Sequence, residues 1–214
     1  MRKNSKVDNN NISINNYVKI ILLGESKVGK TSLISAFNDD KFVEETISTI
    51  CFSSIKKEIT INNIKFMVEI WDTAGQERYH SVSQLFIKGS QIVIFVYDIT
   101  KINTFSKLSF WVNYVRELLN IQVVYGVVAN KMDLLENCEN NELVNEEEGR
   151  NFAEKIGALF TETSCKDNPK AFCEFIKELI CKFISNRIET EKDWNRISLV
   201  SDFPKKKKHK CCEK

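Results

Sequence analysis

The sequence has no apolar run long enough to form a transmembrane helix. Such a helix needs about 20 consecutive apolar residues, and no stretch of the 214 residues approaches that length. The first residues, 1–16, are polar and rich in asparagine, so they lack the apolar core of a secretory signal. We therefore expect a chain that stays in the cytosol.

A disulfide framework and a strong net charge are missing as well. The seven cysteines are an odd number, and five of them are scattered along the chain, as expected for a cytosolic protein. The net charge is only +2, but residues 190–214 hold eight Lys or Arg against four Asp or Glu, leaving −2 elsewhere. A basic tail on a nearly neutral body predicts a local electrostatic contact and argues against a nucleic-acid-binding domain.

Short apolar runs alternate with segments of helical spacing. Apolar residues recur at helical spacing in residues 105–119 and 172–183, and Asn62-Asn63 is a plausible hairpin turn. The runs typical of strands are Tyr17–Gly24, Phe52–Ile61, Ile64–Trp71, Gln91–Asp98, Val123–Asn130 and Ala158–Phe160. This alternation predicts an α/β fold with a mostly parallel sheet covered on both faces. In such folds, ligands bind beyond the carboxyl ends of the strands.

The turn after the first strand reads GESKVGKT, from Gly24 to Thr31. It fits the phosphate-binding pattern G-x-x-x-x-G-K-S/T between a strand and a helix. Its backbone N–H groups can surround a phosphate, Lys30 can reach the β- and γ-phosphates, and the Thr31 hydroxyl suits Mg²⁺. A chance match would arise in roughly one chain per hundred or fewer at average composition, so phosphate binding is the favoured interpretation.

Three further turns follow predicted strands. In DTAGQERY, Asp72 can hold Mg²⁺, Gly75 allows close approach to a γ-phosphate, and Gln76 can orient a water molecule. In NKMD, the Asp133 carboxylate can accept two hydrogen bonds from the guanine edge, which adenine cannot donate. The backbone of ETSCK, residues 162–166, could line the base. Each motif alone is weak, but their order after successive strands makes one strong signal.

With these motifs the chain resembles a small GTPase of the Ras superfamily, and specifically of the Rab family. The matching stretches are GESKVGKTSL, WDTAGQERY, IVIFVYDIT, NKMDL and ETSCK. The resemblance covers residues 17–187 and the tail, and it implies a single three-layer P-loop GTPase domain with a six-stranded sheet. Residues 1–16 are then expected to be a disordered extension, and 188–214 a flexible hypervariable tail.

The resemblance also implies the roles of individual residues. Thr49 is expected to bind Mg²⁺ and the γ-phosphate, Phe42 to contact the guanine, and Gln76 to be catalytic, with Cys165 replacing the usual alanine. Mg²⁺ is expected at Thr31, Thr49 and Asp72. The residues expected to bind GTP or GDP are Ser26, Lys27, Val28, Gly29, Lys30, Thr31, Ser32, Phe42, Thr49, Gly75, Asn130, Lys131, Asp133, Ser164, Cys165 and Lys166.

Such proteins switch between a GTP-bound and a GDP-bound shape, and the expected role is regulation of vesicle trafficking. The implied partners are an exchange factor, a GTPase-activating protein, effectors and a prenyl-transfer escort, and the chain is expected to be a monomer. Two alternatives stay open: an ATPase or kinase that uses the same loop, which Asn130 and Asp133 argue against, and a GTP-binding module with negligible hydrolysis, which Gln76 argues against.

Several residues depart from the family pattern. Lys27 stands where a small residue is common, and its side chain is expected to point to solvent. After Thr49 the chain reads ICFSS, so Cys51 replaces a glycine and Ser54 an aromatic residue. The effector-facing surface is expected to include Ile50, Trp71, Tyr79 and Phe86. The acidic segment 135–149 is interpreted as a surface-loop insertion before a helix that starts near Glu146.

The chain ends in KKKKHKCCEK. A metal site is unfavourable because two adjacent cysteines and one histidine offer too little geometry, and nuclear import is a minor alternative. Cys211 and Cys212 resemble a C-C-x-x prenylation signal, and the lysines would add attraction to an anionic cytoplasmic leaflet. The expected location is the cytoplasmic face of an intracellular membrane, with peripheral anchoring.

Overall fold

The computed structural model describes residues 16–39, 53–73, 80–119, 123–137 and 143–191, which contain a six-stranded sheet in the order β2-β3-β1-β4-β5-β6. The strands are β1 (Tyr17–Leu23), β2 (Ser53–Ile61), β3 (Ile64–Asp72), β4 (Ile92–Asp98), β5 (Val124–Asn130) and β6 (Leu159–Glu162). Strands β2 and β3 pair antiparallel, and all other neighbours pair parallel. The mostly parallel six-stranded sheet expected from the sequence is therefore confirmed.

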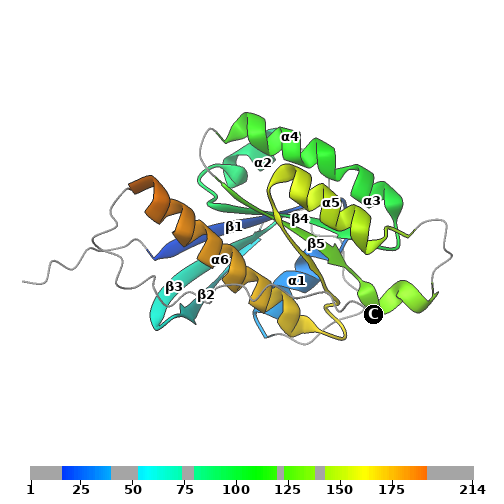
Figure 1. Cartoon of the computed structure of the whole chain (residues 1–214), viewed down its shortest axis with the longest axis horizontal. Coiled ribbons are helices and arrows are strands. Elements are labelled where there is room, and N and C mark those ends of the chain that lie inside the picture. The colour runs from blue at the N-terminus through cyan, green and yellow to red at the C-terminus, as the bar shows by residue number, and fades with distance from the viewer. Residues whose placement is uncertain (1–15, 40–52, 74–79, 120–122, 138–142, 192–214) are drawn as a thin grey trace, which may run out of the picture.

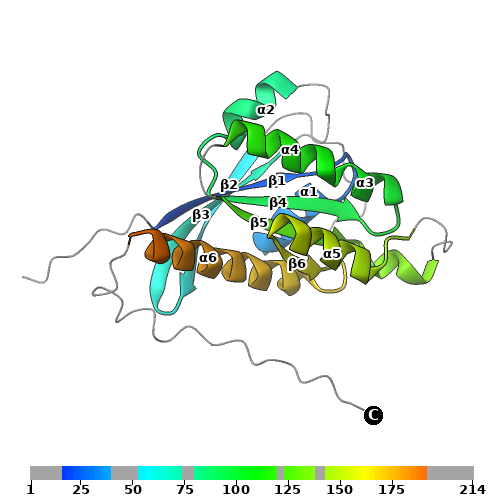
Figure 2. The same ribbon diagram turned by 45° about the horizontal axis from the view of Figure 1, so that its top comes forward.

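Helices cover both faces of the sheet and form three layers (Figures 1 and 2). The helices are α1 (Lys30–Phe37), α2 (His80–Ile87), α3 (Ile102–Ser106), α4 (Leu108–Leu118), α5 (Glu146–Ile156) and α6 (Pro169–Glu191), with a short 3₁₀ helix, η2 (Met132–Asn137). Helices α1 and α6 lie on one face, and α2 to α5 lie on the other. None of the helices in the described ranges is long and apolar enough to cross a membrane.

Each central strand contributes to two apolar cores. In β1, Ile20 and Leu22 belong to the cluster with α1 and α6, whereas Ile21 and Leu23 belong to the cluster with α4 and α5. This alternation follows from the two-residue period of a strand. All seven residues of β4 are buried, which explains why that part of the sequence is continuously apolar.

The hairpin turn expected at Asn62-Asn63 joins β2 to β3. Both asparagines have positive φ, 47° and 62°, as a two-residue type I′ turn requires. Asparagine tolerates this left-handed conformation better than most residues with a Cβ atom. The antiparallel pairing of β2 and β3 therefore has a local cause in the sequence.

The structure refines the predicted boundaries. The helical spacing over residues 105–119 divides at Lys107 into α3 and α4. Helix α6 continues to Glu191, so residues 188–191, predicted to be part of the tail, are helical. Helix α5 begins at Glu146 as predicted, because Asn145 and Glu148 form a reciprocal capping box. Residues 1–15 and 192–214 lie outside the described ranges.

Candidate nucleotide-binding site

The loop between β1 and α1 depends on two glycines. Gly24 has φ of 149°, and a Cβ there would lie 2.1 Å from the carbonyl oxygen of Val96. Gly29 has φ of 94°, and a Cβ there would lie 2.2 Å from Nδ2 of Asn130. Only glycine fits both the conformation and the space at these two positions. The loop therefore packs directly against the ends of β4 and β5.

Lys30 is buried inside this loop, with 5% of its surface exposed. Its Nζ donates hydrogen bonds to the carbonyl oxygens of Gly24, at 2.7 Å, and Glu25, at 2.8 Å. Helix α1 begins at Lys30, so the first-turn amides and the positive end of the helix dipole also face the loop. A buried ammonium beside these amides is an environment suited to phosphate. The Lys27 side chain is exposed, as predicted.

Thr31 and Asp72 come from different elements and meet beside the loop. The Thr31 hydroxyl donates a 2.7 Å hydrogen bond to Oδ2 of Asp72, and Asp72 is only 2% exposed. The adjacent Thr73 hydroxyl donates to the carbonyl oxygen of Leu22 at 2.8 Å, which fixes the end of β3 against β1. A hydroxyl and a carboxylate at this spacing are hard oxygen donors of the kind that Mg²⁺ prefers. These residues therefore fit the predicted metal.

The turn after β5 is tied to the phosphate loop. Asn130 is 2% exposed, and its Nδ2 donates a 2.8 Å hydrogen bond to the carbonyl oxygen of Val28. Its Oδ1 accepts a weak hydrogen bond from the Cys165 thiol at an S···O distance of 3.6 Å. Burial raises the pKa of Cys165 to about 12, so the thiol keeps its proton at neutral pH. Asn130 thus joins the turns that follow β1, β5 and β6.

Asp133 is oriented by a residue from the turn after β6. The Ser164 hydroxyl donates a 2.7 Å hydrogen bond to Oδ1 of Asp133. The Ser164 hydroxyl oxygen in turn accepts hydrogen bonds from the backbone N–H groups of Lys166, at 3.2 Å, and Asp167, at 3.0 Å. The sequence predicted only a backbone role for Ser164, so this side-chain contact was missed. Its effect is to hold the proposed base-selecting carboxylate in one direction.

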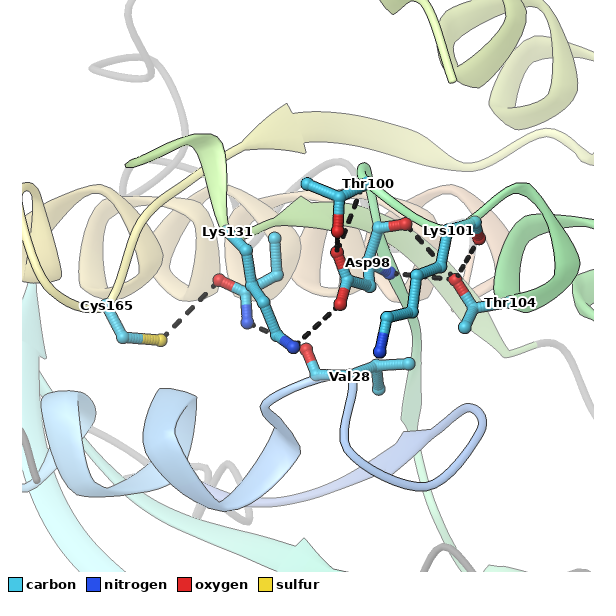
Figure 3. Close-up of polar contacts among 8 residues, drawn as sticks. Val28, Asp98, Thr100, Lys101, Thr104, Lys131 and Cys165 are labelled. Carbon is cyan, nitrogen blue, oxygen red and sulfur yellow. Dashed lines mark hydrogen bonds and ion pairs between the residues drawn. The ribbon is translucent and has the colours of Figure 1, made fainter. Parts of the chain in front are cut away.

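A second missed residue is Asp98, the last residue of β4. Oδ2 of Asp98 lies 2.7 Å from Nζ of Lys131, and Asp98 itself is 1% exposed (Figure 3). The other carboxylate oxygen, Oδ1, accepts hydrogen bonds from the backbone N–H of Thr100, at 3.0 Å, and from its hydroxyl, at 2.7 Å. A charged residue closing the continuous apolar run of β4 was the sequence signal that could have identified it.

Trp71 and Phe86 form a contact at the surface beside β3. Their ring centroids are 5.1 Å apart, and both residues are half-buried. The Lys19 ammonium lies 5.2 Å from the Trp71 ring centroid, within the range of a cation–π contact. Both rings pack against the buried core while staying partly exposed. The predicted combination of core and surface roles therefore agrees with their positions.

Several predicted site residues lie outside the described part of the chain. They are Phe42, Thr49, Ile50, Gly75, Gln76, Tyr79, Cys211 and Cys212. Within the described part, the loop after β1, Asp72, Asn130, Asp133 and Ser164 gather at the carboxyl ends of the parallel strands, as the sequence predicted.

Comparison with known proteins agrees with this geometry. A family model described as the Ras family matches residues 19–184. The chain is 37% identical over 172 residues to Ras-related protein Rab-21 from Bos taurus, which covers 80% of this chain and 73% of that protein. It is 39% identical over 168 residues to Ras-related protein Rab-18-B from Danio rerio, covering 78% and 79% of the two chains. It is also 39% identical over 148 residues to Ras-related protein RHN1 from Nicotiana plumbaginifolia, covering 69% and 72%.

Proposed function

The chain belongs to the Ras family and within it to the Rab small GTPases, and from this premise we propose that it is a GTP-hydrolysing switch. In the GTP-bound state it would bind effectors at a membrane, and after hydrolysis to GDP and phosphate it would release them. Its cellular role would be regulation of vesicle trafficking.

The observation that supports this proposal most is the hydrogen bond between Asn130 and Val28. It links the turn expected to bind the base to the loop expected to bind the phosphates. Asp133, whose carboxylate accepts a hydrogen bond from Ser164, would then accept hydrogen bonds from the ring N–H and exocyclic amine of guanine. An ATP-dependent enzyme would have no use for a carboxylate in that position, because adenine lacks this donor pair.

Hydrolysis needs positioning and charge neutralisation more than covalent chemistry. Lys30 and the loop amides would stabilise charge on the phosphates, and Gln76 would orient the attacking water. Thr31 and Asp72, together with Thr49, would hold Mg²⁺, which neutralises phosphate charge when bound. Thr49 and Gly75 would hold their loops only while a γ-phosphate is present, and this difference in shape is what effectors would recognise.

Two measurements test the proposal. GTP and GDP should displace a fluorescent guanine nucleotide from the protein, whereas ATP at the same concentrations should not. In single-turnover assays the Gln76→Leu variant should hydrolyse bound GTP more slowly than the unmodified protein, with Gln91→Leu as a control. Competition by ATP would refute the base assignment, and equal hydrolysis rates in the two proteins would remove Gln76 from the mechanism.

The intrinsic rate is expected to be slow, because no in-built arginine finger can be identified in the sequence. An activating protein would then raise it by about 10³–10⁵. An exchange factor, effectors and a prenyl-transfer escort complete the proposed set of partners, with the chain acting as a monomer and without nucleic acid.

The tail would anchor the protein to the cytoplasmic face of an intracellular membrane. Two lipid chains on Cys211 and Cys212 would give stable residence, and each nearby lysine would add about 1 kcal/mol at an anionic leaflet. The Cys211→Ser, Cys212→Ser double variant should lose membrane association in cells, whereas Cys181→Ser, on helix α6, should keep it. Membrane retention of the double variant would refute the anchor.

A further inference from the structure

We propose that Asp98 is a positioning residue for the guanine nucleotide, and that it acts through the ammonium group of Lys131. The inference rests on the proposed function, since it concerns the same binding site. Asp98 lies outside the phosphate loop and outside the two turns expected to bind the base, which follow β5 and β6. The inference therefore adds a residue to the proposed site.

The carboxylate of Asp98 is fixed in direction. Oδ1 accepts two hydrogen bonds from Thr100, and this leaves Oδ2 directed at Lys131 (Figure 3). The backbone N–H of Asp98 donates to the Thr104 hydroxyl at 3.0 Å, and that hydroxyl donates to the carbonyl oxygen of Lys101 at 2.8 Å. Rotation of the carboxylate would break both hydrogen bonds from Thr100 and the Lys131 contact, while the Thr104 contacts hold the backbone, so the Asp98 charge has one orientation.

Lys131 is held in an uncommon conformation between Asn130 and Asp133. Its φ is 72°, in the left-handed region that residues with a Cβ atom adopt only rarely. The backbone is fixed on both sides, because Asn130 O accepts from Ile99 N at 3.1 Å and Met132 N donates to Thr163 O at 3.2 Å. The Lys131 side chain is 26% exposed, and its ammonium lies 2.7 Å from Oδ2 of Asp98.

This arrangement would prepare the site before nucleotide binds. A buried carboxylate at 1% exposure is costly without a cationic partner, so Asp98 strongly favours the paired position of Lys131. Restricting a long, flexible side chain in advance lowers the ordering cost of binding. When Asp98 loses its charge, that cost falls on the binding step, and the nucleotide should be released faster.

The first experiment uses the full chain loaded with a fluorescent GDP analogue and measures its release after addition of excess GDP. Asp98→Asn retains the size of the side chain but removes its charge, and release should accelerate roughly ten- to hundredfold, the range expected for loss of a hydrogen bond to a charged group. Glu69→Gln is the matched control, since Glu69 is also a buried carboxylate, 6% exposed, but lies on β3 away from this site. A release rate for Asp98→Asn within twofold of the unmodified protein would overturn the inference.

A double-mutant cycle separates positioning from general support of the fold. If Asp98 acts through Lys131, adding Asp98→Asn to Lys131→Ala should not accelerate release further, because the ammonium that Asp98 orients is already absent. Multiplied effects of the two substitutions would overturn the inference, because Asp98 would then act on the fold and not on the lysine. If Asp98→Asn does not fold, Thr100→Ala serves instead, with a severalfold acceleration expected that also disappears in Lys131→Ala. Failure of the unmodified protein to bind GDP would refute the proposed function itself, so the two failures are distinguishable.

Discussion

The two halves of the sheet differ in how they are covered. Strand β4 is buried along its whole length, whereas β2 alternates between exposed and half-buried residues until Ile61 at its end. Helices pack on both faces of the β4–β5–β6 half. On the β2–β3 half, α1 and α6 cover one face, and much of the opposite face has no helix over it (Figure 2). The covered half ends in the turns that carry the proposed base-recognition residues, and the open half presents a partly exposed surface.

The open face is organised by a buried carboxylate. Glu69 on β3 is 6% exposed and accepts hydrogen bonds from Tyr17 and from the Ser54 hydroxyl, the latter at 3.1 Å, and Lys56 lies 3.5 Å away. The family resemblance leads to an aromatic ring at the position of Ser54, and in this chain a hydroxyl that donates to Glu69 stands there. Trp71 occupies the position opposite Ser54 in the β2–β3 register. The substitution therefore changes the chemistry of the surface beside the Trp71–Phe86 pair.

The largest effect should come from comparing matched apolar truncations in the two halves. Ile94→Ala on β4, which is fully buried, should lower the free energy of unfolding by about 2–5 kcal/mol because it leaves a cavity. Met67→Ala on the open face of β3, where Met67 is 41% exposed, should cost less than about 1 kcal/mol. Urea unfolding of both variants at one fixed GDP concentration tests this. Equal losses would show that the open face is covered in solution.

The next effect concerns the orientation of Asp133. Ser164→Ala removes the hydroxyl that donates to this carboxylate and accepts from two backbone amides, so GDP affinity should fall about tenfold. Ser185→Ala is the control, because the Ser185 hydroxyl donates only to the Cys181 carbonyl oxygen within α6. Calorimetric titration with GDP measures both. Unchanged affinity in Ser164→Ala would mean that Asp133 keeps its direction without the serine.

The smallest effect should depend on pH and fall on the open face. Burial raises the pKa of Glu69, but the hydrogen bonds that it accepts and the nearby Lys56 lower it by more. The pKa of Glu69 therefore lies below its ordinary value of 4.5. Because the folded pKa is lowered, the stabilisation is complete above pH 4.5 and disappears as pH falls through the folded pKa. Glu69→Gln should therefore lose about 1 kcal/mol at pH 7 and approach the unmodified protein at lower pH. Unfolding curves between pH 7 and pH 3 measure this, and a pH-independent difference would contradict the assignment.

Local patterns were enough to predict most of the fold. The short apolar runs located the strands, the Asn62-Asn63 pair located the hairpin, and the helix starting near Glu146 was predicted as well. The site was predicted as far as each motif follows a strand end, because parallel strands bring their carboxyl ends to one edge. The contacts of Asp98 and of the Ser164 side chain were missed, since each has its partner in the turn after β5 and no local pattern records that pairing.

By itself the sequence determined the order of strands and helices, the phosphate loop, the four motifs of the site and the family. These features are short-range, because backbone preferences, residue periodicity and glycine positions act within a few residues. Only the tertiary structure decided which side chains meet: Asn130 with Val28, Ser164 with Asp133, and Asp98 with Lys131. The physical reason is that these contacts join turns 31 to 102 residues apart along the chain, and packing of the sheet alone brings them within hydrogen-bonding distance.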